Sequence, residues 1–74
     1  MNKLIPFNDR LRQILYDKDI STYRFEIETG ISRRFFYRYN HKINRSTLMG
    51  IAYYLDMRVE DLVDGTTAMD ALYR

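Results

Sequence analysis

The chain has 74 residues, of which 46% are hydrophobic and 30% charged, with a net charge of +2, one histidine and no cysteine. This length and composition indicate a single small globular domain, and no apolar run approaches the roughly 20 residues of a membrane-spanning helix. The lack of cysteine excludes disulfides and thiolate metal sites, so we expect no metal and no cofactor.

Apolar residues recur at intervals of three and four along most of the chain, which predicts an all-helical fold. The first predicted helix carries Leu11, Ile14 and Leu15 on one face. Asn8 is its expected N-cap, and Phe7 is expected to act as a hydrophobic staple in front of it.

A second helix is predicted over Thr22–Thr29. Ser21 can cap its N-terminus, and Gly30 suits the left-handed conformation that often follows the last turn of a helix. Phe25 is the expected inward-facing residue of this helix.

A third helix is predicted from Arg33 to about Asn40, with Ser32 as its N-cap. At about 100° per residue, Phe36 and Tyr39 fall on one apolar face, which predicts core residues, with Phe35 at the edge of that face. A second, outward row lies on the opposite side of the helix and consists of Arg33, Arg34, Tyr37, Arg38 and His41.

Two further helices and a tail complete the pattern. Asn44 can cap a fourth helix whose apolar residues are Leu48, Ile51, Ala52 and Leu55. Val59, Leu62 and Val63 predict a short fifth helix that ends at Gly65. In the tail, Thr67 followed by Asp70 resembles the start of one or two further helical turns.

Charge is unevenly distributed along the chain. Residues 29–55 contain five basic side chains and no acidic one, whereas residues 56–74 contain two basic and five acidic side chains. A positive block inside a nearly neutral protein is typical of a surface that contacts phosphates, although most charged runs are only solvated surface. The acids of the last third fit solvated caps better than a metal or catalytic site.

The order of these features resembles the helix-turn-helix of phage repressor and Cro-type (XRE-family) DNA-binding domains. The first part of the likeness is the run from Ser21 to Tyr39, with Thr29-Gly30-Ile31-Ser32 as its turn. The second part is the spacing of apolar residues from Leu48 to Leu62, which resembles the last two helices of that family. The resemblance covers residues 8–64 and implies a compact five-helix, lambda-repressor-like bundle with a C-terminal tail at 65–74.

The resemblance implies a double-stranded DNA operator as the partner. A helix of this width fits the major groove, and its first free amides, together with Ser32, are expected to meet a phosphate. The implied base contacts are Arg33, Arg34, Tyr37 and Arg38, with His41 at the groove edge. The implied phosphate contacts are Thr22, Ser32, Lys42 and Arg45.

The chain also differs from the family pattern, and three of the differences are relevant here. Thr22 replaces the glutamine that commonly opens the second helix, and Glu26 replaces a small residue in its middle. Glu26 must therefore turn outward or shift the packing of the third helix. The loop after the third helix is also about two residues shorter than usual and lacks its glycine.

Two hypotheses follow for function, and neither is an enzyme. The first is a sequence-specific, cytoplasmic transcriptional regulator, a repressor of phage or mobile-element type that binds its operator as a homodimer. The second is a helix-turn-helix fold used as a protein-binding module, such as an antirepressor, a co-regulator or an anti-defence factor.

A dimer or partner surface is the expected role of the remaining exposed apolar residues. Its candidate members are Tyr53, Met69, Leu72 and Tyr73. Two alternatives stay open for the tail, since it either contributes to this surface or folds back over the core.

Overall fold

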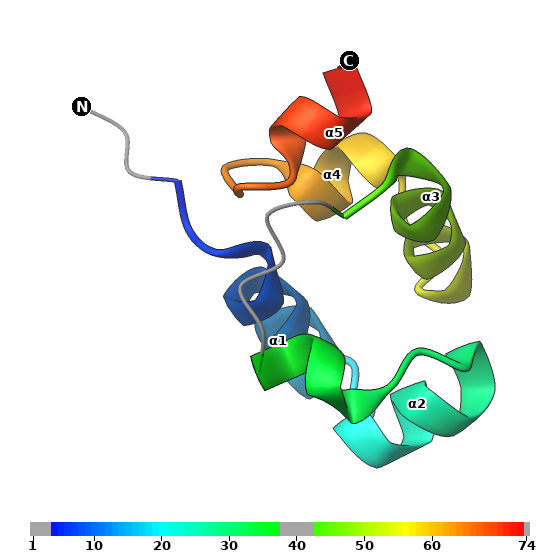
Figure 1. Cartoon of the computed structure of the whole chain (residues 1–74). Coiled ribbons are helices and arrows are strands. Elements are labelled where there is room, and N and C mark those ends of the chain that lie inside the picture. The colour runs from blue at the N-terminus through cyan, green and yellow to red at the C-terminus, as the bar shows by residue number, and fades with distance from the viewer. Residues whose placement is uncertain (1–3, 38–42, 74) are drawn as a thin grey trace.

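The computed structural model describes residues 4–37 and 43–73 of the chain. Its helices, in chain order, are α1 (Phe7–Asp17), α2 (Thr22–Thr29), the 3₁₀ helix η1 (Arg33–Tyr37), α3 (Arg45–Tyr54), α4 (Val59–Val63) and α5 (Met69–Tyr73) (Figure 1). The all-α class is therefore confirmed. No helix within these two ranges is long and apolar enough to cross a membrane.

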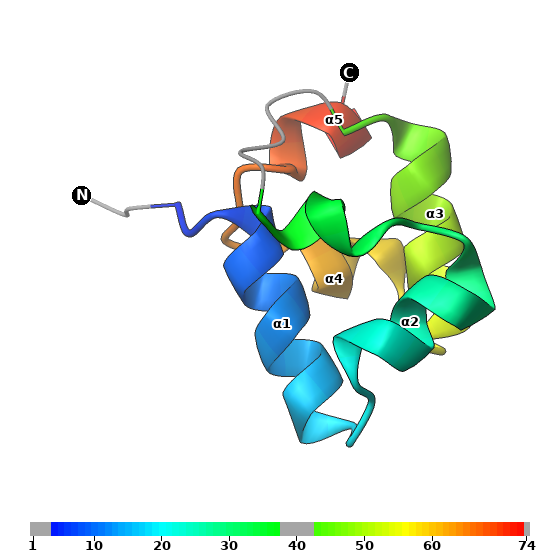
Figure 2. The ribbon, with the colours of Figure 1, turned by 60° about the horizontal axis from the view of Figure 1, so that its bottom comes forward.

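The elements enclose a single core. α1 packs against η1 and α4, while α3 packs against α4 and α5. η1 runs between α1 and α2, as Figure 2 shows from a second direction. After the turn that follows α2, η1 contacts both α1 and α2.

Two of the predicted N-caps are confirmed. The Ser21 hydroxyl accepts a hydrogen bond from the Arg24 amide at 3.0 Å, and the Asn44 side chain accepts one from the Thr47 amide at 2.8 Å. Each bond satisfies a first-turn amide that has no acceptor within its own helix. These caps explain why α2 and α3 begin where the sequence predicts.

Replacing Ser21 by alanine is expected to lower the free energy of unfolding by about 1 kcal/mol, because the Arg24 amide loses its acceptor. The matched control is Ser46→Ala, the same change at an exposed position inside α3, where alanine is the better helix former. Urea unfolding of both variants measures the difference. Equal midpoints would show that the cap contributes nothing.

The predicted start of α1 is wrong by two residues, and Asn8 is not its N-cap. The helix begins at Phe7 after Pro6, whose fixed φ of −58° suits that position. Asn8 lies inside the helix, buried, and its amide group donates to the Phe35 carbonyl at 2.8 Å. Phe7 is the first residue of the helix and part of the core, not a staple in front of the helix.

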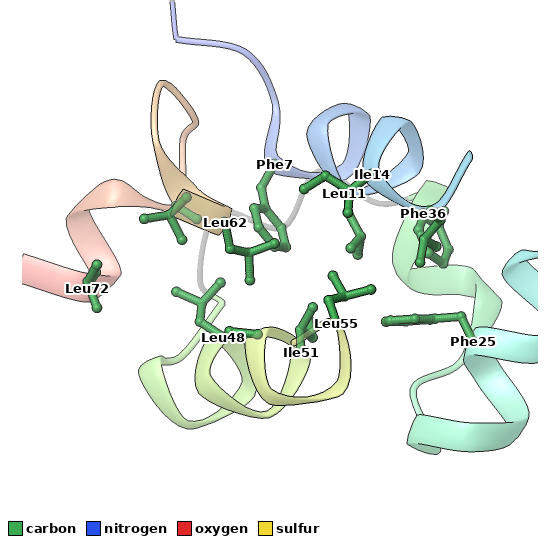
Figure 3. Packing of buried hydrophobic residues seen from close by; sticks show 14 residues of the cluster. Phe7, Leu11, Ile14, Phe25, Phe36, Leu48, Ile51, Leu55, Leu62 and Leu72 are labelled. Carbon is green, nitrogen blue, oxygen red and sulfur yellow. The ribbon is translucent and has the colours of Figure 1, made fainter. Parts of the chain in front are cut away.

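The core contains almost every apolar residue that the helical spacing predicts. Figure 3 shows Phe25 and Phe36 at one end, Leu72 at the other, and side chains of α1, α3 and α4 between them. Phe35 is partly buried against this cluster, as expected of a residue at the edge of the apolar face. Tyr39, also predicted to be buried, lies outside the described residues.

The C-terminal tail folds back on the core, which answers the question left open for it. Ile5 donates to the Gly65 carbonyl and accepts from the Thr67 amide, both at 3.0 Å, so the N-terminal segment pairs with the start of the tail. Ala68 and Leu72 are buried in the core cluster. Residues 65–73 are thus part of the packed domain rather than an appendage.

Candidate nucleic-acid interface

The turn between α2 and η1 is fixed by local hydrogen bonds. Gly30 has φ of 77°, a left-handed conformation that other residues rarely adopt, and its amide donates to the Glu26 carbonyl at 2.8 Å. The Thr29 hydroxyl donates to the Phe25 carbonyl and accepts from the Ile31 amide. Thr29 and Gly30 together therefore set the direction in which η1 leaves α2.

η1 is held from behind by aromatic packing and by side chains of α1. The Phe36 ring meets the Phe25 ring edge to face at 5.6 Å, and the Phe35 ring meets Phe7 in the same way at 6.2 Å. Asn8 and Arg12 donate to the carbonyls of Phe35 and Phe36, respectively. The sequence did not predict these two hydrogen bonds from α1, because the periodicity of α1 identifies only its apolar face.

The third helix stands where it was predicted, but its described part is a 3₁₀ helix rather than an α-helix. Side chains three residues apart eclipse in a 3₁₀ helix. Arg33 therefore stands above Phe36, on the side that faces α2, whereas Arg34 is separated from it by about one third of a turn. Both arginines are exposed, as predicted for the outward row, and Arg33 lies beside α2.

The amides that open η1 are occupied by internal acceptors. The Arg33 amide donates to Glu26 Oε2 at 2.7 Å, and the Arg34 amide donates to the Ser32 hydroxyl at 3.2 Å. The expectation that these amides are free to meet a phosphate is therefore wrong. Ser32 does cap the segment, as predicted.

Glu26 turns outward from α2 and joins it to η1. Besides the Arg33 amide, its carboxylate contacts the Arg33 side chain, with Nε 3.2 Å from Oε1. The guanidinium carbon of Arg33 lies 5.5 Å from the centre of the Tyr23 ring, a cation–π distance. The first expected base-contacting residue is thus held by two side chains of α2.

The other expected DNA contacts divide into described and undescribed residues. Thr22, Arg34 and Arg45 are exposed, with Thr22 and Arg45 at the first positions of α2 and α3. Tyr37 ends η1, but nothing is described of its side chain. Outside the described residues lie Arg38, His41 and Lys42.

The chain was also compared with known proteins. The model of the Cro/C1-type helix-turn-helix (HTH) DNA-binding domain family matches residues 10–67. The chain belongs to this family. No curated protein and no solved structure gave a match. The match supports DNA binding, and its range includes α2, the turn and η1, the segment in which the sequence resemblance places the helix-turn-helix.

In this Cro/C1-type domain, α2 is also tied to α3. The Tyr54 hydroxyl donates to Glu28 Oε1, from which Arg24 Nε lies 3.1 Å away. The Tyr54 and Phe25 rings meet edge to face at 5.6 Å. The hydrogen bond from Tyr54, supported by the charge of Arg24, lowers the pKa of Glu28, and the same bond raises the pKa of Tyr54.

This contact predicts a pH-dependent contribution to stability. Because the pKa of Glu28 is lower in the folded chain than its ordinary value of 4.5, the stabilisation is full above about pH 4.5. It is lost as the pH falls through the folded-state pKa. In Tyr54→Phe the Glu28 pKa should rise towards its ordinary value, which an NMR titration of the Glu28 carboxyl carbon measures. An unchanged pKa in this variant would contradict the assignment.

The residues expected to form a partner surface of the Cro/C1-type domain are not alike. Tyr53 is 79% exposed on α3 and lines two shallow hollows, one shared with the end of α2 and the other with the turn between α3 and α4. Met69 is partly buried against the core, and Leu72 is buried within it. Leu72 therefore belongs to the core rather than to a partner surface, and nothing is described of the Tyr73 side chain.

The acids of the last third behave as solvated side chains. Asp56, Asp61 and Asp64 are exposed, and Glu60 pairs with Arg58 at 3.2 Å. Within residues 4–37 and 43–73, no group of three or more acidic or histidine side chains is arranged to hold a metal ion.

Proposed function

We propose that this chain is a sequence-specific regulator of transcription that binds a short double-stranded operator. The observation that carries the proposal is the position of Arg34, exposed on η1 while Phe36 anchors the same segment on Phe25. An arginine exposed on a segment that packs against the core can pair with the O6 and N7 atoms of guanine. Cro/C1-type family membership supports duplex DNA as the ligand.

Phosphate contacts would fix the domain on the duplex without reading its sequence. Thr22 and Arg45, at the N-termini of two different helices, are proposed for this role, together with Lys42. Ser32 keeps only part of its expected role, because its hydroxyl already accepts from the Arg34 amide. Its oxygen can still donate its own hydrogen to a phosphate.

The proposed biological role is repression in a phage or mobile-element circuit in the cytoplasm. A homodimer would bind a pseudo-palindrome whose half-sites lie about one helical turn apart, and would exclude polymerase from the promoter. Tyr53 is the residue proposed for contact between copies, since its ring is largely solvent-exposed although aromatic residues are enriched at interfaces.

Binding to DNA from upstream of the gene tests this function. Each copy contributes two cations, Lys42 and Arg45. For a dimer they predict that log K falls with log salt at a slope of about −3.6 or steeper. Affinity for the best site should also exceed that for a randomised duplex well beyond tenfold. Light scattering over a concentration series measures whether the dimer forms.

A second candidate function is a protein-binding module, favoured by the exposed Tyr53 ring and by the acidic last third of the chain. In that case the chain would bind neither its own upstream DNA nor a randomised pool at low salt. It would instead co-purify with a larger regulator, and Tyr53→Ala would abolish the association.

A further inference from the structure

Arg33 begins η1 on the side that faces α2. Because residues three apart eclipse in a 3₁₀ helix, Arg33 is aligned with Phe36, whose ring packs on Phe25 of α2. Arg33 is therefore brought to the outer edge of the contact between α2 and η1, where it remains 55% exposed.

Glu26 holds Arg33 at two points. One carboxylate oxygen accepts from the Arg33 amide at 2.7 Å, and the other lies 3.2 Å from Arg33 Nε. A single exposed ion pair restricts an arginine weakly, because the long side chain retains many rotamers. Here the same carboxylate also accepts a hydrogen bond from the Arg33 amide. Arg33 is therefore restrained both at its main chain and at Nε.

Tyr23 adds a third constraint, on the face of the guanidinium. The Tyr23 ring lies 5.5 Å from the guanidinium carbon of Arg33 and is one turn before Glu26 on α2. With Nε on a carboxylate and one face on an aromatic ring, the guanidinium plane has little freedom left. Its two Nη groups have no hydrogen-bond partner among the residues that the structure describes.

We infer that Glu26 and Tyr23 are specificity-determining residues, which preset Arg33 to read one guanine of the operator. The two Nη groups of Arg33 offer the planar pair of donors that matches guanine O6 and N7. This inference rests on the proposed operator binding. It adds the base that Arg33 reads and the two residues that orient its side chain.

Charge supports a role in discrimination rather than in general affinity. The Glu26 carboxylate neutralises Arg33, so the pair attracts the phosphate backbone less than a free arginine does. An unpaired arginine would bind any phosphate within reach. Pairing with Glu26 thus weakens the non-specific attraction of Arg33 to phosphates, while its two Nη groups can still contact guanine.

The experiment is a binding selection from a randomised duplex library with the full chain, followed by affinity measurements on sites substituted one base at a time. The wild type should prefer guanine at one position of each half-site by about 5- to 150-fold over the other bases. Arg33→Met should abolish the preference at that position alone. Glu26→Gln should reduce it by about fivefold while leaving or raising the affinity for random duplex.

Two controls separate orientation of Arg33 from general effects. Glu28→Gln removes the same charge from the same helix, but Glu28 contacts Arg24 and Tyr54 instead of Arg33, so every base preference should persist. In the Arg33→Met background, Glu26→Gln should cause no further loss of guanine preference, because the two residues act as a unit. If Glu26→Gln lowers the helical content measured by circular dichroism, Tyr23→Leu replaces it in the test. Tyr23→Leu should likewise reduce the guanine preference.

The possible failures are distinguishable. A wild-type chain without any sequence preference overturns the proposed function and this inference together. A wild type that binds a defined operator, with the same base preferences in Arg33→Met, overturns only this inference. The same holds if Glu26→Gln and Tyr23→Leu both retain the full guanine preference of the wild type.

Discussion

Phe25→Ala is expected to lower the free energy of unfolding by about 3–5 kcal/mol, the largest effect of any single change considered for this domain. The Phe25 side chain is completely buried, and its ring makes edge-to-face contacts with Phe36 of η1 and Tyr54 of α3. Alanine would leave a cavity and remove both contacts, so three elements would lose their common anchor. A domain of this length has only about 4–11 kcal/mol of stability in total.

Urea and thermal unfolding followed by circular dichroism measure this loss. Ile27→Ala is the matched control, because Ile27 lies on the same helix with its side chain 62% exposed, and its loss should change stability by less than about 0.5 kcal/mol. Similar destabilisation by the two variants would show that the ring cluster is not the anchor. DNA binding by Phe25→Ala should fall in parallel with the folded fraction.

The sequence predicted those helix ends that are fixed by hydrogen bonds between residues close in the chain. Ser21 and Asn44 each accept a hydrogen bond from an amide three residues ahead, and Gly30 provides a positive φ at the residue after α2. These interactions need no partner from elsewhere in the fold. The bounds of α2 could therefore be read from the sequence, and the apolar spacing of α3 likewise identified its buried face.

Interactions between distant residues account for the errors. Asn8 has the chemistry of an N-cap, but its amide group instead donates to the Phe35 carbonyl, 27 residues away. Nothing in a local window distinguishes the two roles. The burial of Leu72 depends in the same way on the pairing of Ile5 with Gly65 and Thr67, which brings the tail onto the core.

The exposure of Arg33 and Arg34 was predicted, but the contacts that Arg33 makes with α2 were not. The basic residues of the third helix were found because charge and helical period are local properties. The engagement of Arg33 with Glu26 and Tyr23 depends on how α2 and η1 pack against each other, which no local period gives. The signal available in the sequence was Glu26 itself, an acid where the resemblance expects a small residue.

Arg34→Ala is expected to weaken binding to the operator by about 1–3 kcal/mol per half-site, or roughly 5- to 150-fold. Arg34 is exposed on η1, its side chain makes no hydrogen bond or ion pair with the residues that the structure describes, and its amide is held by Ser32. The change should therefore remove the proposed base contact without disturbing the fold. The free energy of unfolding should stay within about 0.5 kcal/mol of the wild-type value.

Arg45→Ala is the matched comparison, an arginine-to-alanine change at an exposed position that opens α3. If Arg45 contacts phosphate, its loss should weaken operator and randomised duplex alike and reduce the salt slope by about 0.9 per copy. Arg34→Ala should instead relax the preference at one base position and leave the affinity for random duplex within a few fold. Equal losses on both duplexes for Arg34→Ala would place this side chain on the backbone, and guanine recognition would then fall to other residues of the third helix.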